Sequence, residues 1–223
     1  MLVVLACLVA AVLGWSAPRV LARVPEPDDA PDAKPTYAAL AAAPRLELLL
    51  AVASAVLTGV VGLVVEPDAV LVVWTLLVPA GLLLAYVDAR TRLLPKRLVL
   101  PLNVAVLGLV VVAAALEHDL DLLWRALAGG AGLFVLFAAF WFVAPRGLGY
   151  GDVRLSPALG LTLAASGWME LFVGVYAGFV LAAVLGLVLG RLGRIDPKQF
   201  AFGPYLVAGA FVGVLWQPLV LGG

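Results

Sequence analysis

The chain has 223 residues, of which 65% are hydrophobic and 13% are charged, and its formal net charge is zero. Soluble domains are roughly 45–50% apolar and about 25% charged, so this composition excludes an ordinary soluble protein and indicates one solvated by a lipid bilayer. The neutral balance gives no sign of a nucleic-acid partner, and the single cysteine, Cys7, excludes an intrachain disulfide and a cysteine zinc site.

Apolar segments long enough, or nearly long enough, to cross a bilayer recur along the whole chain, given that a crossing takes about 20 helical residues. In chain order they are Leu2–Trp15, Leu46–Val65, Val70–Val87, Leu98–Leu116, Leu122–Val143, Leu155–Ala165, Leu171–Leu189 and Phe202–Leu221. The first and sixth are short; the sixth could be tilted or packed inside the bundle. We expect the first to be a retained span, because it lacks the basic start of a signal peptide. The sequence predicts an all-α, polytopic membrane helical bundle with about eight transmembrane helices.

Between the first two expected spans, Ser16–Pro44 is rich in proline and acidic residues. This composition predicts a solvated loop rather than a packed domain. We therefore divide the chain into residues 1–45, a first span with a short loop, and residues 46–223, a membrane core.

Basic residues predict the orientation of the bundle. With eight spans, every lysine and arginine except Arg125 falls on one side, which the positive-inside rule makes cytoplasmic. Both termini are then expected on the other side.

Two acidic residues lie at the ends of apolar segments on the basic side. Asp88 ends the third expected span, and Asp152 precedes the sixth. Ionisable groups at membrane depth are costly and mark functional sites. Two carboxylates held close share a proton, so the ionised member can take a proton from water while the protonated member polarises a peptide carbonyl. We expect a catalytic aspartyl dyad.

Glycines flank Tyr150 just before the second acid. Gly149 and Gly151 can adopt positive φ and let another backbone approach closely, which suits a protease that binds extended main chain. An interhelical turn over 145–149 explains the same residues, so both interpretations stay open. The basic residues that follow the first acid are typical positive-inside anchors: Arg90, Arg92, Lys96 and Arg97.

Other functions use intramembrane acids too. A transporter or proton relay would place acids through the depth of the membrane, and the expected spans carry none there. A structural or assembly protein with the same fold is the third alternative. No metal site is expected, because the lone His118 lies on the side opposite the two acids and has no second histidine beside it.

Three ordered motifs resemble those of the type IV prepilin peptidases, which are membrane aspartyl endopeptidases of the Gly-x-Gly-Asp type. They are Asp88 with Leu93-Leu94-Pro95, then Gly149-Tyr150-Gly151-Asp152-Val153-Arg154, then Phe202-Gly203-Pro204-Tyr205. The resemblance implies an enzyme of the bacterial inner membrane that removes the basic leader from pilin-like precursors at the cytoplasmic face. It implies catalytic roles for Asp88 and Asp152. The supporting motif residues are then Gly149, Gly151, Arg154, Pro95, Gly203 and Pro204.

The chain departs from this family in three ways. Many members carry two Cys-x-x-Cys pairs after the first span, but Ser16–Pro44 has no cysteine, so a zinc-bound insert is excluded. Many members also methylate the new N-terminus, so S-adenosylmethionine is expected only if that step is retained; cleavage itself should need no cofactor. Arg154 replaces a lysine and keeps the charge but not the hydrogen-bond shape. Lys96 stands where many members have Asn or Asp. The particular precursor and the oligomeric state stay open.

Overall fold

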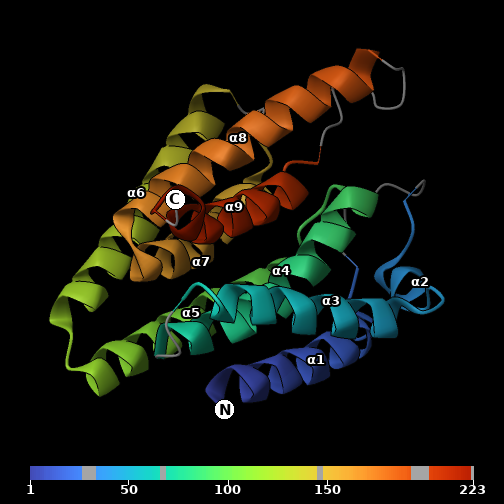
Figure 1. Ribbon diagram of the computed structural model, residues 1–223. Helices are drawn as coiled ribbons and strands as arrows, with labels where there is room; N and C mark the ends of the chain where they lie inside the picture. The colour runs from blue at the N-terminus through green and yellow to red at the C-terminus, as the bar shows by residue number, and fades with distance from the viewer. Residues whose placement is uncertain (27–33, 66–68, 145–147, 192–200, 222–223) are drawn as a thin grey trace.

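The computed structural model describes residues 1–26, 34–65, 69–144, 148–191 and 201–221, and its described residues form helices connected by short loops (Figure 1). The helices are α1 (Leu2–Leu21), α2 (Tyr37–Ala41), α3 (Leu46–Gly62), α4 (Ala69–Thr91), α5 (Lys96–Glu117), α6 (Leu120–Val143), α7 (Tyr150–Ser166), α8 (Trp168–Arg191) and α9 (Gly203–Leu221). All but α2 correspond in order to the eight expected spans. The all-α bundle is confirmed.

The helices differ in how well they suit a bilayer. Among the described residues, five helices are long and apolar enough to cross one, namely α1, α4, α5, α6 and α8. Two others, α3 and α9, are apolar but shorter in their described parts. The helix α7 has 17 residues, and its side chains from Asp152 to Ala165 are mostly buried. Such a helix is solvated by its neighbours, so it needs neither the length nor the apolarity of a lipid-facing span.

Small residues allow α6 and α7 to approach closely. A Cβ atom at Gly160 of α7 would lie 2.6 Å from the backbone oxygen of Gly129 on α6. Close helix contacts through glycine replace the hydrophobic effect as the source of association in a bilayer. This contact holds α7 in the interior, where α4, α5 and α9 also pack against it.

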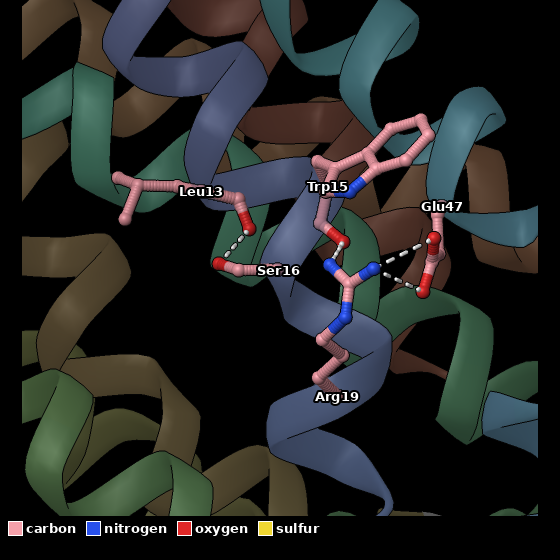
Figure 2. Close-up of polar contacts among 5 residues, drawn as sticks. All are labelled: Leu13, Trp15, Ser16, Arg19 and Glu47. Carbon is pink, nitrogen blue, oxygen red and sulfur yellow. Dashed lines mark hydrogen bonds and ion pairs between the residues drawn. The ribbon is translucent and has the colours of Figure 1, made fainter.

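The helix α1 is longer than the expected first span Leu2–Trp15, because the polar residues near its end have hydrogen-bond or ion-pair partners. The Ser16 hydroxyl donates to the Leu13 carbonyl at 2.9 Å, and Arg19 pairs with Glu47 of α3 at 3.2 Å (Figure 2). Neither residue therefore forces the helix to end, and α1 continues to Leu21.

The solvated loop expected over Ser16–Pro44 is in part wrong. Besides the end of α1, the segment contains α2, which the Thr36 hydroxyl caps by accepting from the N–H of Ala39. Tyr37 and Leu40 of α2 are buried against α1, α3 and α4, because their apolar surface is removed from water there. The acidic stretch 27–33 lies outside the described residues.

Candidate active site

Asp88 lies in the last turn of α4, where the expected third span ends, and only 5% of it is exposed. Its Oδ2 atom accepts a hydrogen bond from the backbone N–H of Gly203 at 2.9 Å. Gly203 is the first residue of α9, so the carboxylate lies at a helix N-terminus, where unpaired N–H groups and the helix dipole stabilise negative charge.

A side chain at position 203 would crowd this carboxylate. A Cβ atom there would lie 2.8 Å from Asp88 Oδ2, which is closer than real Cβ atoms approach. Pro204 follows in the first turn of α9, a position at which its missing N–H costs nothing. The motif Phe202-Gly203-Pro204 therefore brings the start of α9 against the end of α4.

Asp152 lies in the first turn of α7, and only 4% of it is exposed. It was expected before the sixth span, but α7 begins earlier, at Tyr150, since Gly149 in extended conformation serves as its N-cap. The backbone of Gly149 faces the Asp152 carboxylate and favours its negative charge. This is the arrangement of an acidic residue at the third helical position that reaches back to the cap. Asp152 Oδ1 has no hydrogen-bond partner among the described residues.

The positive φ expected for the glycines of this motif is wrong. Gly149 has φ −70°, and Gly151 lies within α7. The absence of a side chain matters instead, since a Cβ atom at Gly151 would lie 2.8 Å from Leu94 Cβ. Leu94 is positioned by Pro95, which begins α5 as its N-cap. The two motifs therefore meet where Leu94 packs against Gly151. Residues 145–147 of the alternative interhelical turn lie outside the described residues.

The structure brings the two acids to the same end of the bundle. The charge of Asp88 acts on Asp152, and Lys34 and Arg92 place positive charge near Asp88. The pKa of Lys34 is lowered by partial burial and by Arg92, while Asp88 opposes this effect. Lys34 was missed in the sequence analysis, because it lies in the segment taken for a solvated loop and no motif marks it.

Arg154 does not pair with either acid. Its guanidinium lies over the ring of Tyr150 at 4.3 Å, and that ring lies 5.0 Å from Trp141 of α6. Asn103 of α5 donates to the backbone oxygen of Arg154 at 2.8 Å. Cation–π and amide contacts therefore hold the start of α7 against α5 and α6. Asn103 was also missed, since a lone amide in an apolar span has no distinctive pattern.

An apolar pocket of about 400 Å³ lies beside the glycines that hold the acids. It is lined by Leu148 and Phe202, each of which immediately precedes one of those glycines, and by side chains of α6 and α8 such as Phe140 and Phe179.

The prediction that no metal is bound concerns the arrangement of possible ligands. Among them, no group of three or more His, Cys, Asp or Glu side chains could hold a metal ion. His118 is exposed and ends α5 in a left-handed conformation, at φ 53°. Two buried carboxylates without a metal can activate water as an acid–base pair.

The model of the type IV leader peptidase family matches residues 71–191, a range that contains both acids. The chain is 37% identical to the prepilin leader peptidase/N-methyltransferase of Stutzerimonas stutzeri over 63% of this chain and 48% of that protein. It is 37% identical to leader peptidase HopD of Salmonella typhimurium over 59% of this chain and 84% of that protein.

The chain spans about half the length of several of these curated relatives. For the prepilin leader peptidase/N-methyltransferase of Aeromonas salmonicida, the identity is 32% over 78% of this chain and 57% of that protein. No solved structure gives a significant match.

Proposed function

Because the chain belongs to the type IV leader peptidase family and is a multi-pass membrane protein, we propose that it is an aspartyl endopeptidase that removes the basic leader from pilin-like precursors. The observation that carries the proposal is the pair Asp88 and Asp152. Both are buried at one end of the bundle, and each lies against the backbone of a glycine at the start of a helix.

The surroundings of the two acids suggest their roles. Asp88 has the positive charges of Lys34 and Arg92 near it, whereas Asp152 faces the charge of Asp88. Asp88 is then the ionised member that takes a proton from the attacking water. Asp152 is the protonated member that donates a hydrogen bond to the peptide carbonyl, and its Oδ1 atom, without a partner among the described residues, is available to it.

The orientation follows from charge. Arg90, Arg92, Lys96 and Arg97 flank the end of α4 that carries Asp88, so this end of the bundle faces the cytoplasm by the positive-inside rule. The apolar pocket between α6 and α8 would receive an apolar part of the precursor. The proton-relay alternative is not favoured, because the buried acids among the described residues, Asp88, Asp152 and Glu170, lie near helix ends.

Substitution of the acids tests the proposal. Asp88→Asn and Asp152→Asn preserve size and hydrogen bonding but remove the titration that the mechanism needs. Each variant, co-expressed with a pilin-like precursor, should leave the precursor uncut while the protein still inserts into the membrane. Unimpaired cleavage by either variant would refute the dyad. Glu47→Gln, which removes an exposed carboxylate of α3, is the matched control and should cleave normally.

Cleavage is proposed to need neither metal nor S-adenosylmethionine. Purified enzyme should keep cutting its precursor after exhaustive chelation and without added S-adenosylmethionine. If activity were lost on chelation and returned only with a divalent cation, the two acids would have to act as metal ligands. Methylation of the product on addition of S-adenosylmethionine would show that the second activity is retained.

A further inference from the structure

An apolar groove runs between α1, α4 and α5, away from the two acids. Its volume is about 210 Å³, and it is lined by Leu13, Ala17 and Val20 of α1, Ala80 of α4, and Leu98 and Leu102 of α5, among others. Ser16 is the polar side chain in its wall, and its hydroxyl already donates to the Leu13 carbonyl (Figure 2). The groove therefore offers nothing but apolar contact.

A basic pocket of about 410 Å³ lies at the charged end of the same helices. Lys96 and Arg97 from the start of α5 and Arg154 from α7 line it. Glu26 also lines it, but its Oε1 atom accepts from the Tyr37 N–H. The balance of charge in the pocket is positive, and the N-terminus of α5 adds to it.

Tyr37 also lines the basic pocket. The residue is 1% exposed, and its hydroxyl has no hydrogen-bond partner among the described residues. Burial and the nearby charge of Glu26 raise the pKa of Tyr37 to about 12, so the hydroxyl keeps its proton at neutral pH. A buried hydroxyl without a partner is costly.

The groove and the basic pocket follow one another along α5 and along the chain at the end of α1. Val20 lines the groove and Val24, one turn later, lines the pocket; on α5, Leu98 lines the groove and Arg97 the pocket. Val24 and Leu98 both pack against the buried cluster that contains Tyr37. The apolar groove and the positive pocket are therefore neighbours on the protein.

We propose that the groove and the basic pocket together bind one anionic phospholipid, with an acyl chain in the groove and the phosphate group in the pocket. The charge complementarity selects this occupant, since Lys and Arg at the cytoplasmic surface attract anionic headgroups. Arg19 is not part of the site, because it pairs with Glu47 on another face of α1 (Figure 2). The proposal does not depend on the peptidase function.

Native mass spectrometry of the purified full chain in detergent tests the proposal, with dioctanoyl phosphatidylglycerol as the probe. One phosphatidylglycerol should bind per chain at concentrations at which dioctanoyl phosphatidylcholine does not. The double variant Lys96→Gln/Arg97→Gln should bind it about thirtyfold more weakly, since each charge near the surface contributes a factor of about five. Both residues are exposed, so their loss should leave the fold intact.

Two further samples distinguish the outcomes. Arg19→Gln removes a charge from the same end of α1 but outside the pocket and should bind phosphatidylglycerol as the wild type does. Ala80→Leu narrows the groove and should weaken binding of the lipid. Equal binding of phosphatidylcholine, or equal loss in Arg19→Gln, would overturn the proposal. Complete competition by millimolar inorganic phosphate, with no effect of Ala80→Leu, would also overturn it and would assign the pocket to free phosphate.

Discussion

Asp88 and Asp152 are held in the same manner although they come from different motifs. Asp88 accepts from the N–H of Gly203 at the start of α9, and the backbone of Gly149 at the start of α7 faces Asp152. The glycines serve two purposes at once, since they present backbone to the acid and leave room for it. This double role explains why glycine precedes or faces each carboxylate in the motifs.

Gly203→Ala adds a single Cβ atom and tests whether the glycine positions the carboxylate of Asp88. The added Cβ would lie 2.8 Å from Asp88 Oδ2, so the carboxylate or the start of α9 has to move. Because a displacement of about 1 Å in a catalytic group can cost about a hundredfold in rate, cleavage of a precursor peptide should fall by about that factor.

The control for this variant is Gly108→Ala on α5. A Cβ atom at Gly108 has nothing within 4 Å, so cleavage should be unchanged and helix stability should improve by up to about 1 kcal/mol. Equal rates for the two variants would show that the contact between Gly203 and Asp88 does not position the acid.

Some residues of the candidate site could be predicted from the sequence, and others could not. The acids and the motif glycines could be selected as candidates because their types and spacing are unusual in apolar segments. Lys34 and Asn103 could not be found, since their importance comes from what lies across from them in space. The same holds for Glu170, a buried acid near the start of α8 whose Oε2 lacks a partner among the described residues.

At the scale of helices, the exception to the charge pattern has a structural reason. Arg125 of α6 donates from Nε to the Ala164 carbonyl at 2.6 Å and from Nη2 to the Ala165 carbonyl at 2.9 Å. These are carbonyls of the last turn of α7, which have no partners within the helix. A cation at a helix C-terminus also interacts favourably with the negative end of the helix dipole. Arg125 therefore caps α7 instead of anchoring a cytoplasmic loop.

Arg125→Met should accordingly destabilise the bundle. Loss of hydrogen bonds from a charged donor costs about 2 kcal/mol, and the exposed carbonyls gain no other partner from the methionine. The measurement is the free energy of unfolding in detergent. Precursor cleavage at low temperature should change little, because Arg125 lies at the end of α7 opposite Asp152.

Arg19→Met provides the comparison for Arg125. Its ion pair with Glu47 is exposed, with side-chain exposures of 53% and 35%, so the expected loss is at most about 1 kcal/mol. An equal loss for both arginines would argue that α7 needs no cap.

At the scale of the whole molecule, the structure predicts which positions share a membrane face. A cysteine-free background needs only Cys7→Ser. Single cysteines at Ala89 and Tyr150, both exposed and both at the end of the bundle that carries the acids, should react with an impermeant maleimide from the cytoplasm. A cysteine at His118 should react from the other side. If Ala89 and Tyr150 reacted from opposite sides, the two acids would be a bilayer apart and the site would not exist.

By itself the sequence determined the helical class, the order of the spans, the basic end and the two acids. Hydropathy, charge and short motifs express these features locally, so they can be read along the chain. Only the tertiary structure decided that the start of α9 lies against Asp88, that α2 packs against α1, α3 and α4, and that Arg125 caps α7. Each of these depends on a contact between residues distant in sequence, and neither partner alone carries a pattern that announces the other. The start of α7 was also misplaced. Burial among other helices, which the sequence does not reveal, allows this short and partly polar segment to be helical.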